Sequence, residues 1–588
     1  MNLTNFLKQI DALTAKYATE QLIAFVHEIG RVLPEHHREN FLEMLKSAGN
    51  GAGKASGKNE DKDRDFDEKY RQIRDSLKSI DSEEMMITEI MNQEYDDWYD
   101  DSGEEFYYED DSGISDILQE ACDFVHICMD RQRYEEGFEI GDQIFEMEIL
   151  CGTEFDVEEF SIRDLVKHEL LSCNLKQVIL DAVYCAYHTV PAAQRPETLY
   201  RMIVHGNEDA VTLEAIMQHG DEQIPDLADF LPHWITYLGD KTGHDADRLI
   251  LEAVSLLNDV SLEEQYAEKF AAVHPGLYLN ILENGKDVTV DEMVSIGIKA
   301  MKEIPKNYTM RSRAALKTAE YVIAAGGERS LLEKCYFIAY ESGISALNYL
   351  RALLNGWEGE AKREELREIF IQAPVHKSGG SFGMLEGSSS HSEREENSLD
   401  SNTVLLLRFL DGQFADVLDK GLNKSEALGW TGTFMKQGMA LYLLYLYEGQ
   451  WNGKGISAMA EIARRAMGFS AEEYQKGICG LEEMSEKDLF CQLFVKWKSM
   501  VQMEADIRNR AGKRITELME KRTEGIMNAN RRNYYGECAA YIAALGEVRE
   551  SMGELGAKQS LMTSYKNVYP RRSAFREEMR RFGWRDFK

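Results

Sequence analysis

The stretch AALKTAEYVIAAGGERSLLEKCYFIAYESGI, residues 314–344, decides the fold. Its apolar residues recur every three to four positions on both sides of a short glycine-containing turn, which predicts two helices joined as an antiparallel hairpin. Small residues lie where one helix meets the other: Ala315, Ala319, Ala325, Gly326 and Ala339. Because small side chains let two helices approach closely, the pattern predicts a tightly packed helical hairpin.

Two further stretches repeat this pattern. Residues 115–149 read SDILQEACDFVHICMDRQRYEEGFEIGDQIFEMEI, with Tyr134 at the turn and Gly137 and Gly141 on the second helix. Residues 538–570 read CAAYIAALGEVRESMGELGAKQSLMTSYKNVYP, and Pro570 ends the second helix because proline cannot continue it. The chain is therefore predicted to be built from stacked helical hairpins.

The shared pattern resembles the tetratricopeptide repeat, in which a turn aromatic packs below two closely paired helices. The resemblance implies an all-α, tetratricopeptide-like α-solenoid whose extended surface binds other proteins. No constant 34-residue period emerges, so the repeats are degenerate. Residues 310–360 and 530–580, with YPRRSAFREEM at 569–579, also resemble the repeat region that follows SWIM zinc fingers in some bacterial proteins. The finger itself, CxC followed by CxH, is absent from the sequence, so its metal chemistry is not implied.

Composition agrees with a helical chain. The 588 residues include only 9 prolines and are 44% apolar, so we expect at least about 60% helix and almost no sheet. The longest apolar run, MALYLLYLY at 439–447, has nine residues, whereas a membrane-spanning helix needs about 20. The first residues lack a basic segment followed by an apolar one. We therefore expect a cytoplasmic protein without a membrane partner.

Changes in composition predict five segments. Residues 1–47 form an N-terminal helical module, and the glycine-rich, charged residues 48–65 form a flexible linker. A helical-repeat domain follows at 66–373. Residues 374–402, rich in glycine and serine, form a disordered linker, and residues 403–588 form a C-terminal helical-repeat domain with a basic end.

Searches for catalytic and ligand-binding motifs give no candidates. The G-x-S-x-G match at 379–383 lies in the glycine- and serine-rich linker, where no strand and helix can form a nucleophile elbow. The segment GQWNGKG at 449–455 has the wrong spacing for a phosphate loop. The 9 cysteines include no CxxC pair, which predicts buried, reduced thiols. We therefore predict no catalytic residue, no metal site and no cofactor.

The most unusual composition is at 94–111, EYDDWYDDSGEEFYYEDD, which has ten carboxylates, six aromatic residues and no cation. One interpretation is a solvated acidic face whose rings anchor it on a neighbouring repeat. The other is a recognition element for a basic partner, because carboxylates attract cationic surfaces and rings stack on guanidinium groups. Its candidate partner-binding residues are Tyr95, Trp98, Tyr99, Phe106, Tyr107 and Tyr108.

The C-terminal end has the opposite charge. The whole chain carries −36, yet residues 504–588 contain 18 Lys/Arg and 12 Asp/Glu, giving +6 there and −42 elsewhere. The arginines of the last helix can be an ordinary solvated face or can contact a partner or phosphate groups. They are also candidates to cover residues 94–111 within the chain. The candidate residues are Arg571, Arg572, Arg576, Arg580 and Arg581.

These features favour a non-enzymatic scaffold, adaptor or regulatory subunit whose partner is another protein with a basic surface. Nucleic acid bound by the basic end is a lesser alternative. A hydrolase or nuclease with an unrecognised site and an acidic inhibitor that mimics nucleic acid stay open as other classes. An enzyme should show convergent carboxylates or histidines with shifted pKa in a pocket, whereas an adaptor should show a broad groove with exposed aromatic rings.

Overall fold

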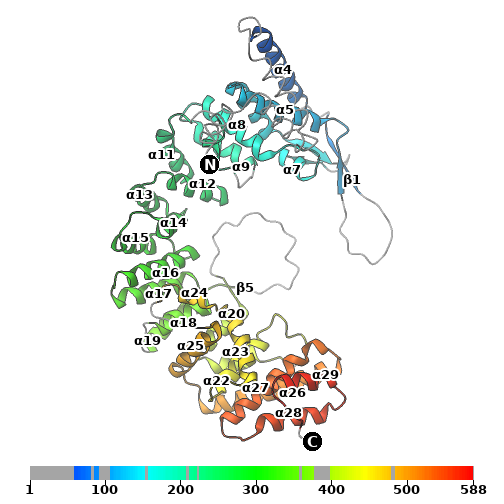
Figure 1. Cartoon of the computed structure of the whole chain (residues 1–588), viewed down its shortest axis with the longest axis vertical. Coiled ribbons are helices and arrows are strands. Elements are labelled where there is room, and N and C mark those ends of the chain that lie inside the picture. The colour runs from blue at the N-terminus through cyan, green and yellow to red at the C-terminus, as the bar shows by residue number, and fades with distance from the viewer. Residues whose placement is uncertain are drawn as a thin grey trace, which may run out of the picture. The chain divides into compact units, whose positions relative to one another are not determined.

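The computed structural model describes residues 59–80, 85–91, 106–152, 157–206, 211–220, 224–355, 360–376, 398–424, 426–478 and 484–586. About 70% of these residues are helical, in 26 α-helices. The expectation of a predominantly helical chain is confirmed for the described residues. Contacts between Cα atoms divide the chain into two compact units, Met1–Cys185 and Ala186–Lys588, and each is described by itself (Figure 1).

Unit 1 combines helices with a small sheet. Its helices α4, α5 and α6 contact one another, and the ring of Phe66 stacks on that of Phe124 with centroids 5.0 Å apart. The sheet has the order β2-β1-β3-β4, with β1 and β3 parallel and both outer pairs antiparallel. The elements are α4 (Asn59–Ile80), β1 (Ile87–Met91), β2 (Phe106–Glu109), α5 (Ile114–Asp130), α6 (Tyr134–Glu146), β3 (Ile149–Gly152), β4 (Val157–Phe160), α7 (Ile162–Lys167) and α8 (Leu175–Thr189), whose last residues belong to unit 2.

The first half of unit 2 is a succession of short helices, drawn in green in Figure 1. Helices α12, α14 and α16 contact one another in a row, and α13 contacts α15 in a second row. The hairpins α12–α13 and α14–α15 therefore each contribute one helix to each row. The helices are α9 (Arg195–Gly206), α10 (Leu213–Met217), α11 (Leu227–Leu238), α12 (His244–Ser255), α13 (Val260–Phe270), α14 (Gly276–Asn284), α15 (Val290–Glu303), α16 (Thr309–Ala324), α17 (Arg329–Ser342), α18 (Ala346–Leu354) and α19 (Glu360–Gln372).

The second half of unit 2 surrounds a helix that is buried on nearly every side. Helix α22 contains most of the nine-residue apolar run and contacts α21, α23, α26 and α27. The hydroxyls of Tyr442 and Tyr445 donate hydrogen bonds to the carbonyl oxygens of Phe414 (2.5 Å) and Val501 (2.7 Å). The elements are β5 (Val375–His376), β6 (Leu399–Asp400), α20 (Ser401–Leu410), α21 (Phe414–Gly421), α22 (Met435–Leu446), α23 (Lys454–Ala466), α24 (Ala471–Gln475), α25 (Glu486–Met500), α26 (Ala505–Asn528), the 3₁₀ turn η2 (Arg532–Tyr534), α27 (Tyr535–Ser551), α28 (Ala557–Val568) and α29 (Ser573–Arg581).

Among the described helices, none combines the length and the apolar character that crossing a bilayer requires. The apolar run at 439–447 instead lies in the protein core.

The three stretches that predicted helical hairpins all fold as hairpins: α5–α6, α16–α17 and α27–α28. Their small residues do lie at close contacts. A Cβ atom added to Gly137 would lie 2.9 Å from the Cβ of Cys128, and one added to Gly546 would lie 2.4 Å from the Cα of Lys558. Helix α28 ends at Val568, two residues before Pro570.

The sequence interpretation missed the four strands of unit 1. Residues 149–152 and 157–160 lie within a region predicted to be helical, and β2 lies at the end of the acidic-aromatic segment. The strands are four or five residues long and pair across a sequence separation of up to about sixty residues. Such short runs give no period that separates strand from helix.

The segment boundaries also differ from the predicted ones. Helix α4 begins at Asn59, inside the predicted linker 48–65, and its buried residues begin at Phe66 and extend to Ile80. The predicted module 1–47 lies outside the described residues. The predicted linker 374–402 contains β5 and β6, which pair in parallel, and most of the rest of it lies outside the described residues.

Residues on both sides of 374–402 contribute to one buried hydrophobic cluster. The buried hydrophobic cluster extends from Met301 to Trp584, and the hydroxyl of Tyr336 donates to the carbonyl oxygen of Gly477 at 2.7 Å. The division between units falls instead at Cys185, within the predicted repeat domain 66–373.

Candidate functional site

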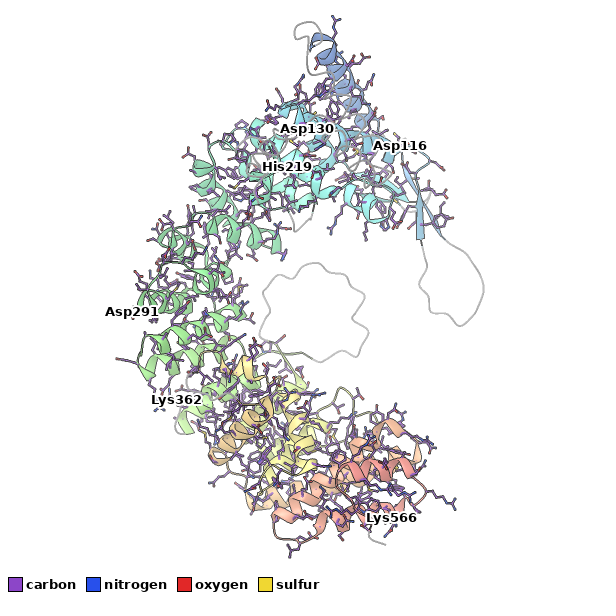
Figure 2. All side chains as sticks on the ribbon, viewed as in Figure 1. Asp116, Asp130, His219, Asp291, Lys362 and Lys566 are labelled. Carbon is purple, nitrogen blue, oxygen red and sulfur yellow. The ribbon has the colours of Figure 1, made fainter. Side chains whose placement is uncertain are left out.

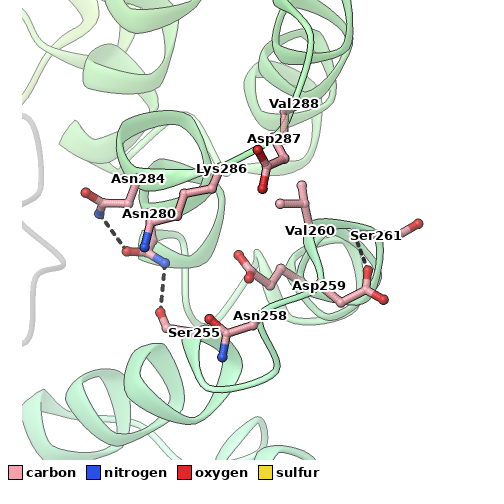
Figure 3. A pocket seen from close by; sticks show the side chains of 12 residues that line it. Ser255, Asn258, Asp259, Val260, Ser261, Asn280, Asn284, Lys286, Asp287 and Val288 are labelled. Carbon is pink, nitrogen blue, oxygen red and sulfur yellow. Dashed lines mark hydrogen bonds between the residues drawn. The ribbon is translucent and has the colours of Figure 1, made fainter.

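A polar groove lies at the ends of two successive hairpins in unit 2 (Figure 3). Its volume is about 590 Å³, within the usual range of ligand sites. Three carboxylates and one ammonium group line it, and no aromatic ring does. The lining residues are Ser255, Asn258, Asp259, Val260, Ser261, Glu263, Asn280, Asn284, Gly285, Lys286, Asp287 and Val288.

The turns α12–α13 and α14–α15 form two walls of this groove. Each contains one residue in the left-handed region, Asn258 (φ 50°) and Asp287 (φ 58°), a conformation that Asn and Asp tolerate better than most residues. The side chain of Asp259 accepts hydrogen bonds from the first amides of α13, and Thr289 forms a capping box with Glu292 at the start of α15. Asp291, in the first turn of α15, marks this end of the helix in Figure 2. The caps fix both helix starts at the groove.

A chain of hydrogen bonds along the groove joins α14 to α12. The Nδ2 atom of Asn284 donates to Oδ1 of Asn280 (2.9 Å), and Nδ2 of Asn280 donates to the Ser255 hydroxyl (3.0 Å). That hydroxyl donates to the carbonyl oxygen of Leu251 (2.8 Å). Asn284 is exposed and keeps one N–H and its amide oxygen without a partner among the described residues. These atoms can hydrogen-bond a ligand.

Glu263 lines the groove from the first turn of α13 and is 8% exposed. Burial and the neighbouring carboxylate of Asp259 raise the pKa of Glu263 above its ordinary value. Within the described part of the chain, its carboxylate has no hydrogen-bond donor and no cation in contact. The groove therefore holds the carboxylate of a largely buried side chain, and no donor or cation of the described residues pairs with it.

Three of the six aromatic candidates at 94–111 lie outside the described residues: Tyr95, Trp98 and Tyr99. Phe106, Tyr107 and Tyr108 belong to β2, which pairs with β1. Successive strand residues point to opposite faces, and Tyr107 is 47% exposed while Tyr108 is half-buried.

Tyr108 packs within unit 1. Its ring centroid lies 5.2 Å from that of Phe160 and 4.5 Å from that of His168. Asp110 accepts hydrogen bonds from the backbone amides of Ile114 (3.0 Å) and Ser115 (2.6 Å) at the start of α5. Part of the acidic-aromatic segment thus has a structural role, whereas Tyr107 stays accessible.

The C-terminal arginines are mostly engaged within unit 2. Arg572 hydrogen-bonds the side chain of Asn530 and the carbonyl oxygen of Met527 (2.7 Å), which ties α29 to the end of α26. Arg580 and Arg581 pair with glutamates one turn earlier on α29, at 3.1 and 2.8 Å.

Arg571 and Arg576 have no charged partner among the described residues. The nearby rings of Phe575 and Trp584 are buried in the core and cannot stack on bases. A partner-binding role for the five arginines at this end stays a prediction.

The segment 449–455, rejected above as a phosphate loop, leads into α23. The carboxylate of Glu547 on α27 accepts hydrogen bonds from the amides of Gly455 (3.1 Å) and Ile456 (2.7 Å), and from Nζ of Lys558 (2.5 Å). The amides that would bind a phosphate at this helix start already have a carboxylate partner. Among the described residues, no three His, Cys, Asp or Glu side chains gather as metal ligands.

The sequence interpretation did not select the groove residues, although a signal was present. The hexapeptides DVSLEE (259–264) and DVTVDE (287–292) are similar and lie at the starts of α13 and α15. The similarity marks two helix starts, although Asp259 is the N-cap of α13 whereas Asp287 lies two residues before Thr289, the N-cap of α15. The burial of Glu263 has no such local signal. No protein-family model matches the chain, and comparison with curated proteins gives no significant match.

Proposed function

We propose that this chain is a non-enzymatic adaptor or scaffold, built from degenerate tetratricopeptide-like hairpins, that binds an extended segment of another protein in the polar groove of unit 2. The observation that carries the proposal is the hydrogen-bonded row of Ser255, Asn280 and Asn284. An extended peptide backbone presents alternating N–H and C=O groups, and an asparagine amide can donate to one and accept from the other. The row fixes these amides before a ligand arrives, which lowers the entropic cost of binding.

The charge of the chain supports a basic partner. The net charge is −36, and the groove lining carries two more carboxylates than ammonium groups. An acidic surface attracts cationic segments at long range and repels nucleic acid. The eight cysteines in the described residues are free thiols, which supports the proposal of a cytoplasmic protein.

One observation favours the rival class, a hydrolase. Glu263 has a raised pKa and shares the groove with Asp259 and Asp287, and convergent carboxylates are typical of hydrolytic sites. However, Asp259 already uses Oδ1 for the amides of Ser261 and Leu262. We therefore prefer the binding function, whose donors and acceptors are the asparagine amides.

The test is selection of a displayed library of random twelve-residue peptides on the full chain. Enriched peptides are synthesised, and their affinities for the parent and for Asn284→Ala are compared. We expect a loss of about three- to tenfold, the usual worth of one or two hydrogen bonds. The matched control is Gln265→Ala, an exposed position of α13 outside the groove. If no peptide is enriched, or if Asn284→Ala binds like the parent, the proposed function is wrong.

A further inference from the structure

Four carboxylates of the described residues are buried, and three of them have partners. Asp181 contacts Nδ1 of His126 at 2.9 Å, and Asp411 pairs with Nε of Arg367 at 2.5 Å. Glu547 accepts two backbone amides and the ammonium group of Lys558. The fourth, Glu263, has none. Glu263 lies on the wall of the groove.

The side chain of Glu263 is largely buried while its carboxylate opens on the groove, and no donor or cation of the described residues pairs with it. A protein that needed only a filled core at this position would be better served by an apolar or amide side chain. The lining gives Glu263 no compensation: Asp259 and Asp287 add negative charge, and Lys286 is exposed and not in contact with it. None of the lining residues therefore neutralises the carboxylate of Glu263, which is open to a cationic group of a ligand.

We infer that the carboxylate of Glu263 binds the cationic side chain, lysine or arginine, of the protein segment held in the groove. This inference rests on the proposed function. The amides of Asn280 and Asn284 would bind the backbone of the segment, and Glu263 lines the same groove, where a long side chain of the segment could pair with it. Lysine and arginine both have an apolar stem that tolerates burial while the charged end pairs with the carboxylate. A metal ion fits less well, since no cluster of three ligands forms among the described residues.

The experiment is a double-mutant cycle with the enriched peptides. Each lysine of a peptide is replaced by acetyl-lysine and each arginine by citrulline, which remove the charge and keep the shape. Binding of every version to the full chain is measured for the parent and for Glu263→Gln. We expect one charge removal to cost about tenfold or more in the parent and almost nothing in Glu263→Gln, because a hydrogen bond between two charged groups is stronger than one between neutral groups.

The control is Glu268→Gln on the same helix, whose exposed carboxylate lies outside the groove and should leave the cost unchanged. A preference for lysine or for arginine identifies the side chain, and either result supports the inference. If peptides bind through Asn284 but no basic residue is coupled to Glu263, the inference is overturned and the proposed function stands. If Asn284→Ala also binds the peptides as the parent does, the proposed function is wrong, and the inference that rests on it is wrong as well.

Discussion

At the scale of single residues, Glu263 makes a prediction about stability and pH. Its pKa is raised in the folded state by burial and by Asp259, above an ordinary value of 4.5. At a pH below the ordinary pKa, the carboxyl group is protonated in both the folded and the unfolded chain, so the free energy of unfolding is not reduced. As pH rises, the unfolded chain releases this proton first, so stability falls through this interval and the loss is complete above the folded-state pKa.

Glu263→Gln removes that loss. We expect the variant to be more stable than the parent at pH 7, by at most about 1 kcal/mol, because it carries no proton whose release is hindered in the folded state. The gain should shrink to zero or reverse near pH 4. Thermal unfolding of parent and variant from pH 4 to pH 8 measures this, with Glu268→Gln as the control. A variant less stable than the parent at pH 7 would show that Glu263 has a stabilising partner within the chain.

The burial of Glu263 is a feature that could not be predicted from the sequence. Hairpin turns and helix caps follow local rules, and the similarity of DVSLEE and DVTVDE marks two helix starts. Burial of Glu263, by contrast, depends on how α12, α13 and α14 pack in space. A glutamate in an amphipathic helix has no sequence feature that distinguishes a buried position beside a groove from a solvated one.

At the scale of elements, close helix packing makes a second prediction. Gly455 on α23 lies against the backbone of α27, and an added Cβ would lie 2.3 Å from the amide nitrogen of Ala544. Because backbone cannot move aside as a flexible side chain can, Gly455→Ala should destabilise unit 2 by about 2–3 kcal/mol. Denaturant unfolding of the full chain measures the loss.

Gly512 provides the matched control. It lies inside α26, and nothing is within 4 Å of the position where its Cβ would be. Gly512→Ala should therefore stabilise the chain by about 0.5–1 kcal/mol, the difference in helix propensity. Equal effects of the two substitutions would contradict the role assigned to close helix contact.

The contrast between helices and strands explains which elements the sequence predicted. The hairpins α16–α17 and α27–α28 are local, and their apolar period and small residues are readable within about thirty residues. The sheet of unit 1 joins β1 to β3 across some sixty residues, and its strands carry mixed polar residues such as those of β2. Strand pairing of this kind is decided by tertiary contacts, so the sequence period does not report it.

At the scale of the whole molecule, charge should govern how fast a partner arrives, whereas the groove should govern how long it stays. Long-range attraction acts on diffusional encounter and is screened beyond about 10 Å at 0.1 M salt. A short-range pair such as Glu263 with a basic side chain acts mainly on dissociation. The two contributions can therefore be separated by kinetics.

The acidic residues 94–105 allow this separation. Changing their seven carboxylates to amides lowers the magnitude of the net charge from −36 to −29 and leaves Asp110, which holds the start of α5, intact. We expect the association rate of the enriched basic peptides to fall about two- to threefold at low salt and to depend less on salt, with little change in dissociation. Glu263→Gln should do the opposite and speed dissociation at an unchanged association rate. Stopped-flow binding at several salt concentrations measures both. If the amide variant associates as fast as the parent at every salt concentration, residues 94–105 do not attract ligands to the groove, and their role in steering a basic partner is refuted.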